Sequence, residues 1–245
     1  MVYCLPNVFG KWCRPNYNSV VATYCHSIVN GVPIQINDPN RELNLVYIDD
    51  VIEEFINAMQ GKANIQDGGF AHVKRSLFIT LQKLADTLQS FSENRKTLII
   101  PNFEDTMVKF LYATYLSYST ESSCIYPLEM KHDNRGWLAE FIKSKQFGQI
   151  FVSKTKPGNK RGEHWHHTKG EKFLVIHGKA LIKLRQLHSN TVIQYEVSGD
   201  ELRVLDIPAG FTHSITNIGD EDIITLFWAN ELFDKNKPDT YYLEV

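Results

Sequence analysis

The chain has 245 residues, of which 43% are hydrophobic and 22% charged, the composition of a globular protein with one or two domains. The formal net charge of −2 and the strand-length apolar stretches exclude a basic nucleic-acid surface and a membrane-spanning helix. We therefore expect neither nucleic acid nor membrane as a partner. The four cysteines show no paired metal spacing, which favours a reduced, cytoplasmic protein.

Residues 1–10 are strand-like and lack the charged and apolar regions of a signal peptide. Natural domains rarely begin inside a strand. We therefore expect an N-terminally truncated chain, whose longer ancestor has lost its front half.

The front of the chain reads as a mixture of helices and strands. Helix-like apolar spacing occurs in three segments, residues 18–28, 51–59 and 76–91. Residues 112–124 are rich in Ser and Tyr and have little periodicity, as is typical of a connection between domains. We expect an α+β domain over residues 1–120 and a second domain over residues 129–245.

The back of the chain consists of short β-rich runs separated by turn residues. The clearest runs are residues 149–153, 173–177, 180–184, 191–197, 203–207 and 223–228. Short strands at this spacing, without helices between them, predict a β-sandwich or β-barrel.

Histidines concentrate around the start of this β-rich region. If His164 and His166 lie on one strand, their spacing puts both imidazoles on the same face, because side chains alternate along a strand. Gly170 allows a tight turn, so that Glu171 can bring a carboxylate to the same ion from the start of the next strand. His213 follows a turn shaped by Pro and Gly, and we expect it to begin another strand.

Three imidazole nitrogens and one carboxylate oxygen suit Zn, Fe, Mn, Ni or Cu and leave coordination positions for water or substrate. A pair of histidines in a loop is, however, more often a surface accident than a ligand pair. The residues alone leave that alternative open.

Two segments resemble the motifs of the cupin family. They are Gly158-x5-His164-x-His166-x4-Glu171-x6-Gly178 and Pro208-x-Gly210-x2-His213-x3-Asn217. One position departs from the pattern, because Leu202 stands where the second motif usually opens with Gly. The resemblance implies an all-β cupin barrel, a double-stranded β-helix or jelly roll, that binds a divalent metal, with zinc as the expected ion. The implied metal ligands are His164, His166, Glu171 and His213.

The segment Asp133-Asn134-Arg135-Gly136 resembles the Asp-x-Arg-Gly segment of cupin-type epimerases that act on nucleotide-linked 4-keto sugars. In that family a base removes the proton beside the ketone, and a cation or donor stabilises the enolate before reprotonation on the opposite face. The resemblance implies a nucleotide-linked keto-sugar as substrate, and Arg161 as a substrate-binding residue. The catalytic candidates are Lys172, His167, Asp133 and Arg135.

Some of these charged residues also have simpler roles open to them. Lys172 follows Glu171 directly, and neighbouring side chains of a strand point to opposite faces, so we do not expect both at one site. Lys172 and Arg135 are equally compatible with solvated ion pairs on the barrel surface, and Asp133 with a turn.

Residues 5–10, 33–36 and 41–51 are similar to the substrate-binding half of the extended short-chain dehydrogenases, which have a Rossmann-type fold. This similarity implies that Asn7 and Arg41 contact a nucleotide sugar. Cys4 stands where that family usually has Arg. The pair Asp49 and Asp50 is equally compatible with a cap on the following helix.

The chain contains neither the Gly-x-x-Gly-x-x-Gly turn that cradles a dinucleotide nor a Tyr-x3-Lys pair. NADPH is the cofactor of the full-length family, but its binding motif is absent here. We therefore expect no hydride transfer from this chain alone.

A reductase-like half followed by a cupin resembles the capsular polysaccharide assembling proteins, a family of bifunctional UDP-sugar epimerases and reductases. The resemblance implies a homodimer whose cupin epimerises C3 of a UDP-4-keto-6-deoxy-N-acetylhexosamine on the path to UDP-N-acetyl-L-fucosamine. Two alternatives stay open. One is a non-catalytic cupin whose metal serves sugar binding or dimerisation, and the other is an iron-dependent cupin dioxygenase.

Overall fold

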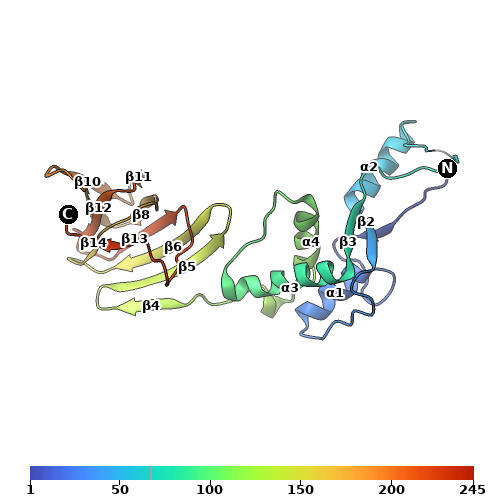
Figure 1. Cartoon of the computed structure of the whole chain (residues 1–245), viewed down its shortest axis with the longest axis horizontal. Coiled ribbons are helices and arrows are strands. Elements are labelled where there is room, and N and C mark those ends of the chain that lie inside the picture. The colour runs from blue at the N-terminus through green and yellow to red at the C-terminus, as the bar shows by residue number, and fades with distance from the viewer. Residues whose placement is uncertain (67) are drawn as a thin grey trace. The chain divides into compact units, whose positions relative to one another are not determined.

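The computed structural model describes residues 1–66 and 68–245, and it divides the chain into two compact units. The first comprises Met1–Lys96 and Pro101–Tyr126, and the second comprises Thr97–Ile100 and Pro127–Val245. Figure 1 labels many of the elements of both units. In the part of the chain that the structure describes, none of the helices combines the length and the apolar character needed to cross a bilayer.

The first unit is built around a three-stranded sheet in the order β1-β2-β3. The strands are β1 (Asn7–Phe9), β2 (Glu42–Tyr47) and β3 (Leu77–Thr80). β1 pairs with β2 in parallel, and β3 pairs with β2 antiparallel. The helices are α1 (Val20–Val29), α2 (Ile48–Met59), α3 (Leu81–Thr97) and α4 (Thr106–Leu116), and a 3₁₀ turn covers Glu121–Ser123. Because α1 lies between two parallel strands in the chain, β1, α1 and β2 form a βαβ unit.

The helices of the first unit have the expected caps and core positions. The Ser19 side chain accepts a hydrogen bond from the Ala22 amide and starts α1, and Asp105 does the same for two amides of α4. On α3 the fully buried side chains recur every three or four residues, as an amphipathic helix requires. They are Leu84, Leu88 and Phe91.

Two expectations for the first unit need correction. Residues 76–91 do not form a single helix, because Leu77–Thr80 is a strand that pairs with β2 and the helix begins at Leu81. Residues 112–124 are not merely a connection, since the first of them complete α4. Tyr112 and Tyr115 contact the ring of Phe91, with centroid distances of 5.1 and 5.8 Å, so tertiary packing supports a helix that the polar sequence concealed.

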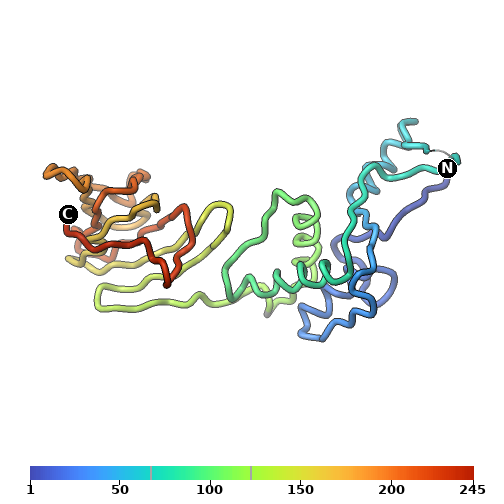
Figure 2. The backbone as a smooth tube through the Cα atoms, in the orientation of Figure 1, coloured from blue at the N-terminus to red at the C-terminus, as the bar shows by residue number. Residues whose placement is uncertain are grey.

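The second unit is a cupin-like sandwich of two antiparallel sheets. The five-stranded sheet has the order β10-β9-β12-β7-β14, and the six-stranded sheet has the order β11-β8-β13-β6-β5-β4. In chain order the strands are β4 (Met130–Asp133), β5 (Gly136–Ser144), β6 (Gly148–Thr155), β7 (Lys160–Trp165), β8 (Glu171–His177), β9 (Lys179–Gln186), β10 (Val192–Ser198), β11 (Val204–Ile207), β12 (Phe211–Asn217), β13 (Ile223–Ala229) and β14 (Tyr241–Tyr242). Figure 2 follows their backbone in yellow-green to red.

The core of the second unit lies between its two sheets. Apolar side chains alternate with outward ones along the strands, as a half-buried sheet requires. The most buried of them include Phe173, Ile182, Ile207, Ile215 and Ile223. The six β-rich runs recognised in the sequence correspond to β6, β8, β9, β10, β11 and β13. The strands β4, β5 and β14 were not predicted from their sequence.

Candidate metal centre

Four side chains of the second unit converge on one point. The ligand atoms of His164, His166, Glu171 and His213 all lie within 4.8 Å of one another. The Nε2 atoms of His166 and His213 lie 3.2 and 3.3 Å from Oε2 of Glu171. Three of the four residues are buried, and His164 is partly buried.

Strand pairing brings these residues together from distant parts of the chain. His164 on β7 lies opposite His213 on β12, and Glu171 begins β8 as expected. Two details differ from the expectation, because β7 ends at Trp165, one residue before His166, and His213 is the third residue of β12. Both imidazoles nevertheless reach the same site.

A bulge in β7 aims His164 at its neighbours. Ser214 pairs with Gly162 while His213 pairs with His164, so Glu163 is an extra residue with a φ of 60°. Gly162 has a φ of 96°, and a Cβ at this position would lie 2.6 Å from the carbonyl oxygen of His213. The bulge therefore requires glycine at Gly162 for its conformation and for its close approach to β12.

The electrostatics of the cluster match those of metal ligands. Burial and the neighbouring His213 and His166 lower the pKa of His164 to about 4. Burial would raise the pKa of Glu171, but the imidazoles of His166 and His213 outweigh it and lower this pKa to about 2. At neutral pH Glu171 is thus a carboxylate and His164 a neutral imidazole, the protonation states in which these side chains bind metals.

The geometry also fits a divalent ion. Nε2 of His166 and Oε2 of Glu171 are buried, and neither has a hydrogen-bond partner among the residues that the structure describes. Ligand atoms bonded to zinc at about 2.0–2.2 Å stand roughly 3–3.5 Å apart, which agrees with the separations around Glu171. The other ring nitrogens of His166 and His213 contact the backbone. Nδ1 of His166 lies 2.6 Å from the Asp239 carbonyl oxygen, and Nδ1 of His213 lies 3.5 Å from the Phe211 carbonyl oxygen.

A cavity of about 350 Å³ opens beside the cluster, a size within the usual range for small-molecule sites. His164, Glu171 and His213 lie on its wall. Aromatic side chains form another part of the wall, and the ring centroids of Phe151 and Phe173 lie 4.8 and 4.6 Å from that of Phe227. The Ser153 hydroxyl also lines the cavity and is buried without a partner in the described part of the chain.

Two arginines that line the cavity are held by one carboxylate. The Arg135 guanidinium lies 2.6 Å from Oδ2 of Asp133, and that of Arg161 lies 3.5 Å from it. The hydrogen bond from Arg135 lowers the pKa of Asp133, so this carboxyl group is ionised and is a weak base. Arg161 also donates a hydrogen bond from Nε to the Thr155 hydroxyl, at 2.9 Å. Asp133 therefore orients Arg135 and Arg161.

The other two catalytic candidates do not reach the cavity. Lys172 points away from Glu171 across the strand and forms an ion pair with Asp206 on β11. His167 is exposed, and its backbone amide donates a hydrogen bond to Oδ1 of Asp239 at 2.8 Å. Strand alternation explains the position of Lys172, and the end of β7 before His166 explains that of His167.

The two substrate-binding candidates of the first unit share one hollow. Asn7 and Arg41 both line a cavity of about 460 Å³, together with polar residues that include Asn18, Gln35 and Asn37. The Asn7 side chain donates a hydrogen bond to the Asn44 carbonyl oxygen at 3.2 Å, which fixes it beside β2.

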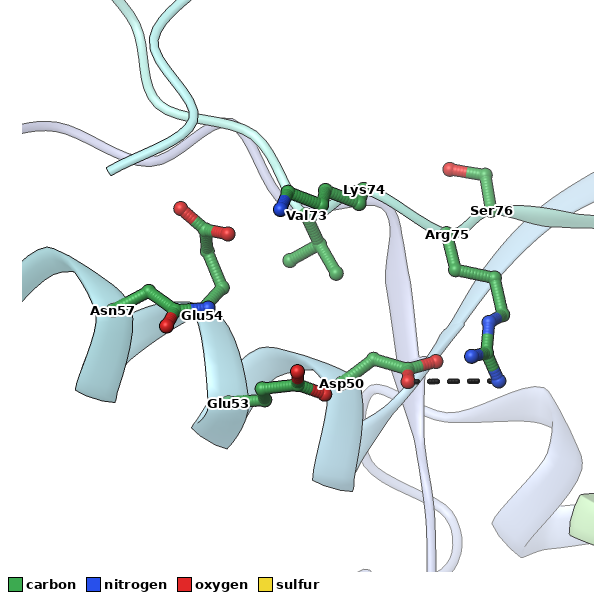
Figure 3. Close-up of a pocket in the computed structure, with 8 residues that line it drawn as sticks. All are labelled: Asp50, Glu53, Glu54, Asn57, Val73, Lys74, Arg75 and Ser76. Carbon is green, nitrogen blue, oxygen red and sulfur yellow. Dashed lines mark ion pairs between the residues drawn. The ribbon is translucent and has the colours of Figure 1, made fainter. Parts of the chain in front are cut away.

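A further hollow of the first unit contains one of the two aspartates considered as a helix cap. α2 begins at Ile48, and within the described chain the preceding Tyr47 makes no side-chain cap bond. Asp50 instead faces Arg75, 3.7 Å away, across a hollow of about 460 Å³ that Glu53 and Glu54 also line (Figure 3). Burial raises the pKa of Asp50. Sequence reasoning did not identify this hollow, because its two sides are far apart in the chain.

Comparisons with known proteins agree with this architecture. Residues 131–241 match the family model described as the polysaccharide biosynthesis C-terminal domain. A curated relative from Pseudomonas aeruginosa, UDP-2-acetamido-2,6-beta-L-arabino-hexul-4-ose reductase, is 41% identical over 244 residues. That alignment covers 100% of this chain, and the chain spans 65% of the relative's length.

Solved structures of CapF are also similar over nearly the whole chain. The capsular polysaccharide assembling protein CapF from Staphylococcus aureus is 48% identical, with a TM-score of 0.93 over 98% of this chain and 70% of that one. A CapF structure with the inhibitor 3-isopropenyl-tropolone is 48% identical, with a TM-score of 0.95 over 99% of this chain and 71% of that one. The chain therefore belongs to the family of the capsular polysaccharide assembling protein CapF.

Proposed function

We propose that the second unit is a zinc-dependent 3-epimerase of a UDP-4-keto-6-deoxy-N-acetylhexosamine, on the path to UDP-N-acetyl-L-fucosamine. The observation that carries this proposal is the convergence of four ligand atoms beside a cavity that three of the four ligand residues and two arginines line. An isomerase of this kind needs a positive partner for the ketone oxygen, and this arrangement offers several.

The substrate class is supported by the named relatives. The Pseudomonas relative is named as a reductase of a UDP-2-acetamido-hexul-4-ose, and the Staphylococcus relative is named for capsular polysaccharide assembly. A 4-ketone acidifies the hydrogen on the neighbouring C3. Removing that proton and returning one to the opposite face inverts C3 without any net change in atoms or electrons.

The chain's own residues would bind and shield the sugar. Arg135 and Arg161 carry permanent charge toward the cavity, and their shared carboxylate, Asp133, keeps both side chains in place for an anionic or enolate oxygen. Phe151, Phe173 and Phe227 supply an apolar wall that excludes water. When bound, a divalent ion would supply Lewis-acid stabilisation of negative charge on oxygen.

The role of the general base is not filled by a residue separate from the proposed metal ligands. Among the described residues that line the cavity, the side chains able to act as a base at neutral pH are the proposed ligands themselves. This observation favours a second candidate function, in which the metal-bearing cupin binds the nucleotide sugar and does not transform it. In both functions the arginines and the aromatic wall bind the ligand.

We further propose that the first unit is the substrate-binding half of a Rossmann-type, extended short-chain dehydrogenase. The parallel β1-α1-β2 unit and the hollow shared by Asn7 and Arg41 support this assignment. Hydride transfer is not part of the proposal, because the sequence carries neither the glycine-rich turn nor the Tyr-x3-Lys pair. The hollow would hold part of a nucleotide sugar.

The proposal is tested by incubating the purified chain with a UDP-4-keto-6-deoxy-N-acetylhexosamine in deuterated water. An epimerase will place deuterium at C3, measured by NMR, faster than the same sugar exchanges without protein. Sugar binding without deuterium at C3 would reject the epimerase and support the second candidate. The variant Arg161→Met removes a cavity-lining charge while leaving the proposed ligands intact, and an epimerase should exchange C3 more slowly in this variant.

A further inference from the structure

The segment before β14 is fastened to the loop that follows β7 through one side chain. Oδ1 of Asp239 accepts a hydrogen bond from the His167 amide at 2.8 Å, and Oδ2 accepts from the amides of Thr168 and Lys169, each at 3.0 Å. The Thr168 hydroxyl adds a bond of 3.1 Å to Oδ2. A single carboxylate therefore organises three successive residues directly after His166.

The backbone of the same residue holds the ring of His166. Nδ1–H of His166 donates a hydrogen bond to the Asp239 carbonyl oxygen at 2.6 Å. A carbonyl oxygen can only accept, so Nδ1 carries the proton of this hydrogen bond. Nε2 is then the ring nitrogen that faces Glu171, 3.2 Å away.

The conformation of Asp239 is one that an L-residue adopts only when its surroundings enforce it. Its φ is 40°, in the left-handed region. Its carboxylate oxygens accept hydrogen bonds from the amides of residues 167–169 and from the Thr168 hydroxyl. These four bonds therefore enforce the turn that presents the carbonyl oxygen to His166.

Contacts on either side of Asp239 support the same attachment. Tyr241 on β14 pairs with Trp165 on β7, and their rings stack with centroids 4.7 Å apart. Nζ of Lys169 donates a hydrogen bond to the Pro238 carbonyl oxygen at 3.1 Å. Residues 238–241 are thus attached to the chain on both sides of His166, at Trp165 and at Lys169.

We propose that Asp239 is a positioning residue of the metal centre, whose carboxylate and carbonyl oxygen together fix the tautomer and direction of the His166 imidazole. This inference rests on the proposed metal site and adds to it a partner outside the four ligands. Residues that orient a ligating histidine in this way affect metal affinity when they are changed. The alternative is a clamp that stabilises the loop without any effect on the ion.

The two roles differ in their effect on metal affinity, which can be measured with the whole chain. The variant Asp239→Ala keeps a backbone carbonyl but removes the four hydrogen bonds that hold it in place. Asp234→Ala is the matched control, because Asp234 lies in the same C-terminal segment, is exposed, and its side chain bonds only to the amide of Asn236 in the described chain. Both substitutions change the net charge equally.

Zinc affinity is measured by competition with a chromophoric chelator, and the ligand field by the absorption spectrum of the cobalt-loaded chain. We expect Asp239→Ala to weaken zinc binding about 10- to 100-fold and to change the cobalt spectrum, and Asp234→Ala to leave both unchanged. Thr168→Val, which removes one of the four hydrogen bonds, is expected to give a smaller weakening in the same direction. It serves as the test if Asp239→Ala does not fold.

Wild-type zinc affinity and an unchanged cobalt spectrum in folded Asp239→Ala would overturn the positioning role and leave the metal site intact. If Asp239→Ala does not fold, an unchanged zinc affinity in Thr168→Val would likewise overturn it. If the wild-type chain bound neither zinc nor cobalt, the metal centre itself would be rejected, and the inference with it. Deuterium incorporation at C3 is measured separately, so a failure of the epimerase proposal is distinguishable from both results.

Discussion

Nε2 of His166 and Oε2 of Glu171 face each other at 3.2 Å, buried and without a hydrogen-bond partner among the residues described. Nδ1 of His166 is bonded to the Asp239 carbonyl oxygen, so Nε2 is the ring nitrogen that faces the Glu171 carboxylate in a site shielded from water. Burying unpaired polar atoms in this way is unfavourable unless a cation lies between them. The relationship between these two atoms is therefore the strongest physical argument for a bound ion.

The first prediction concerns the metal content. His213→Ala removes one of the three imidazoles, and we expect the purified variant to lose the divalent ion that the wild-type chain retains through dialysis. Elemental analysis measures the result. His177→Ala is the control, because His177 lies outside the ligand cluster and pairs with Glu221 on the surface. Equal metal content in both variants would contradict the ligand assignment.

A second prediction concerns the bulge that aims His164. Gly158→Ala is the control, because Gly158 also has a positive φ, of 72°, but no atom lies within 4 Å of a Cβ added there. We expect this control to destabilise the fold by about 1–2 kcal/mol through backbone strain alone. Gly162→Ala carries the same conformational strain and also forces its Cβ against the His213 carbonyl oxygen. We expect Gly162→Ala to be more destabilising in urea unfolding and to lower zinc affinity. Equal losses of stability in the two variants would contradict the close approach.

The third prediction is a pH dependence centred on Asp133. Because Arg135 lowers the folded-state pKa of Asp133, the ion pair contributes stability above the unfolded-state pKa of about 3.9 and loses it as the pH falls through the lowered value. Asp133→Asn removes this contribution. The difference in Tm between wild type and variant should be present at about pH 6 and should close under more acidic conditions. A difference that persists at low pH would show that Asp133 acts through contacts other than its charge.

The fourth prediction separates residues that reach the cavity from those that do not. Lys172→Met should leave C3 exchange close to the wild-type rate, since Lys172 pairs with Asp206 on the outer face of β8. Arg161→Met should slow exchange about tenfold or more, which corresponds to the loss of a charged hydrogen bond to substrate. A large loss of exchange in Lys172→Met would contradict this prediction and show that Lys172 takes part in the reaction.

The sequence was sufficient to identify the four converging residues but not the way they are brought together. The two-residue spacing of His164 and His166 suggested a shared strand face, whereas the structure uses a bulge at Glu163 and a strand end before His166. A bulge depends on the partner strand, and no pattern in a single strand predicts it. Strand alternation did separate Lys172 from Glu171 correctly.

Residues that act from a distance escaped sequence reasoning altogether. Asp239 lies 73 residues after His166, in a segment without a metal-binding motif, and its importance follows only from the hydrogen bonds it accepts. Similarly, the polar sequence of residues 112–124 concealed the end of α4, whose tyrosines pack on Phe91. In both cases tertiary contacts decide the structure, and local sequence carries little sign of them.

Three of the four converging residues lie on strands, and these strands belong to both layers of the sandwich. β7 and β12 carry His164 and His213 in the five-stranded sheet, and Glu171 begins β8 in the six-stranded one. An ion bound by these ligands would cross-link the two sheets. Any movement of one sheet relative to the other would therefore break metal–ligand bonds. Release of the ion during gentle heating should therefore precede unfolding. The temperature of this release would report how firmly the two sheets are packed against each other.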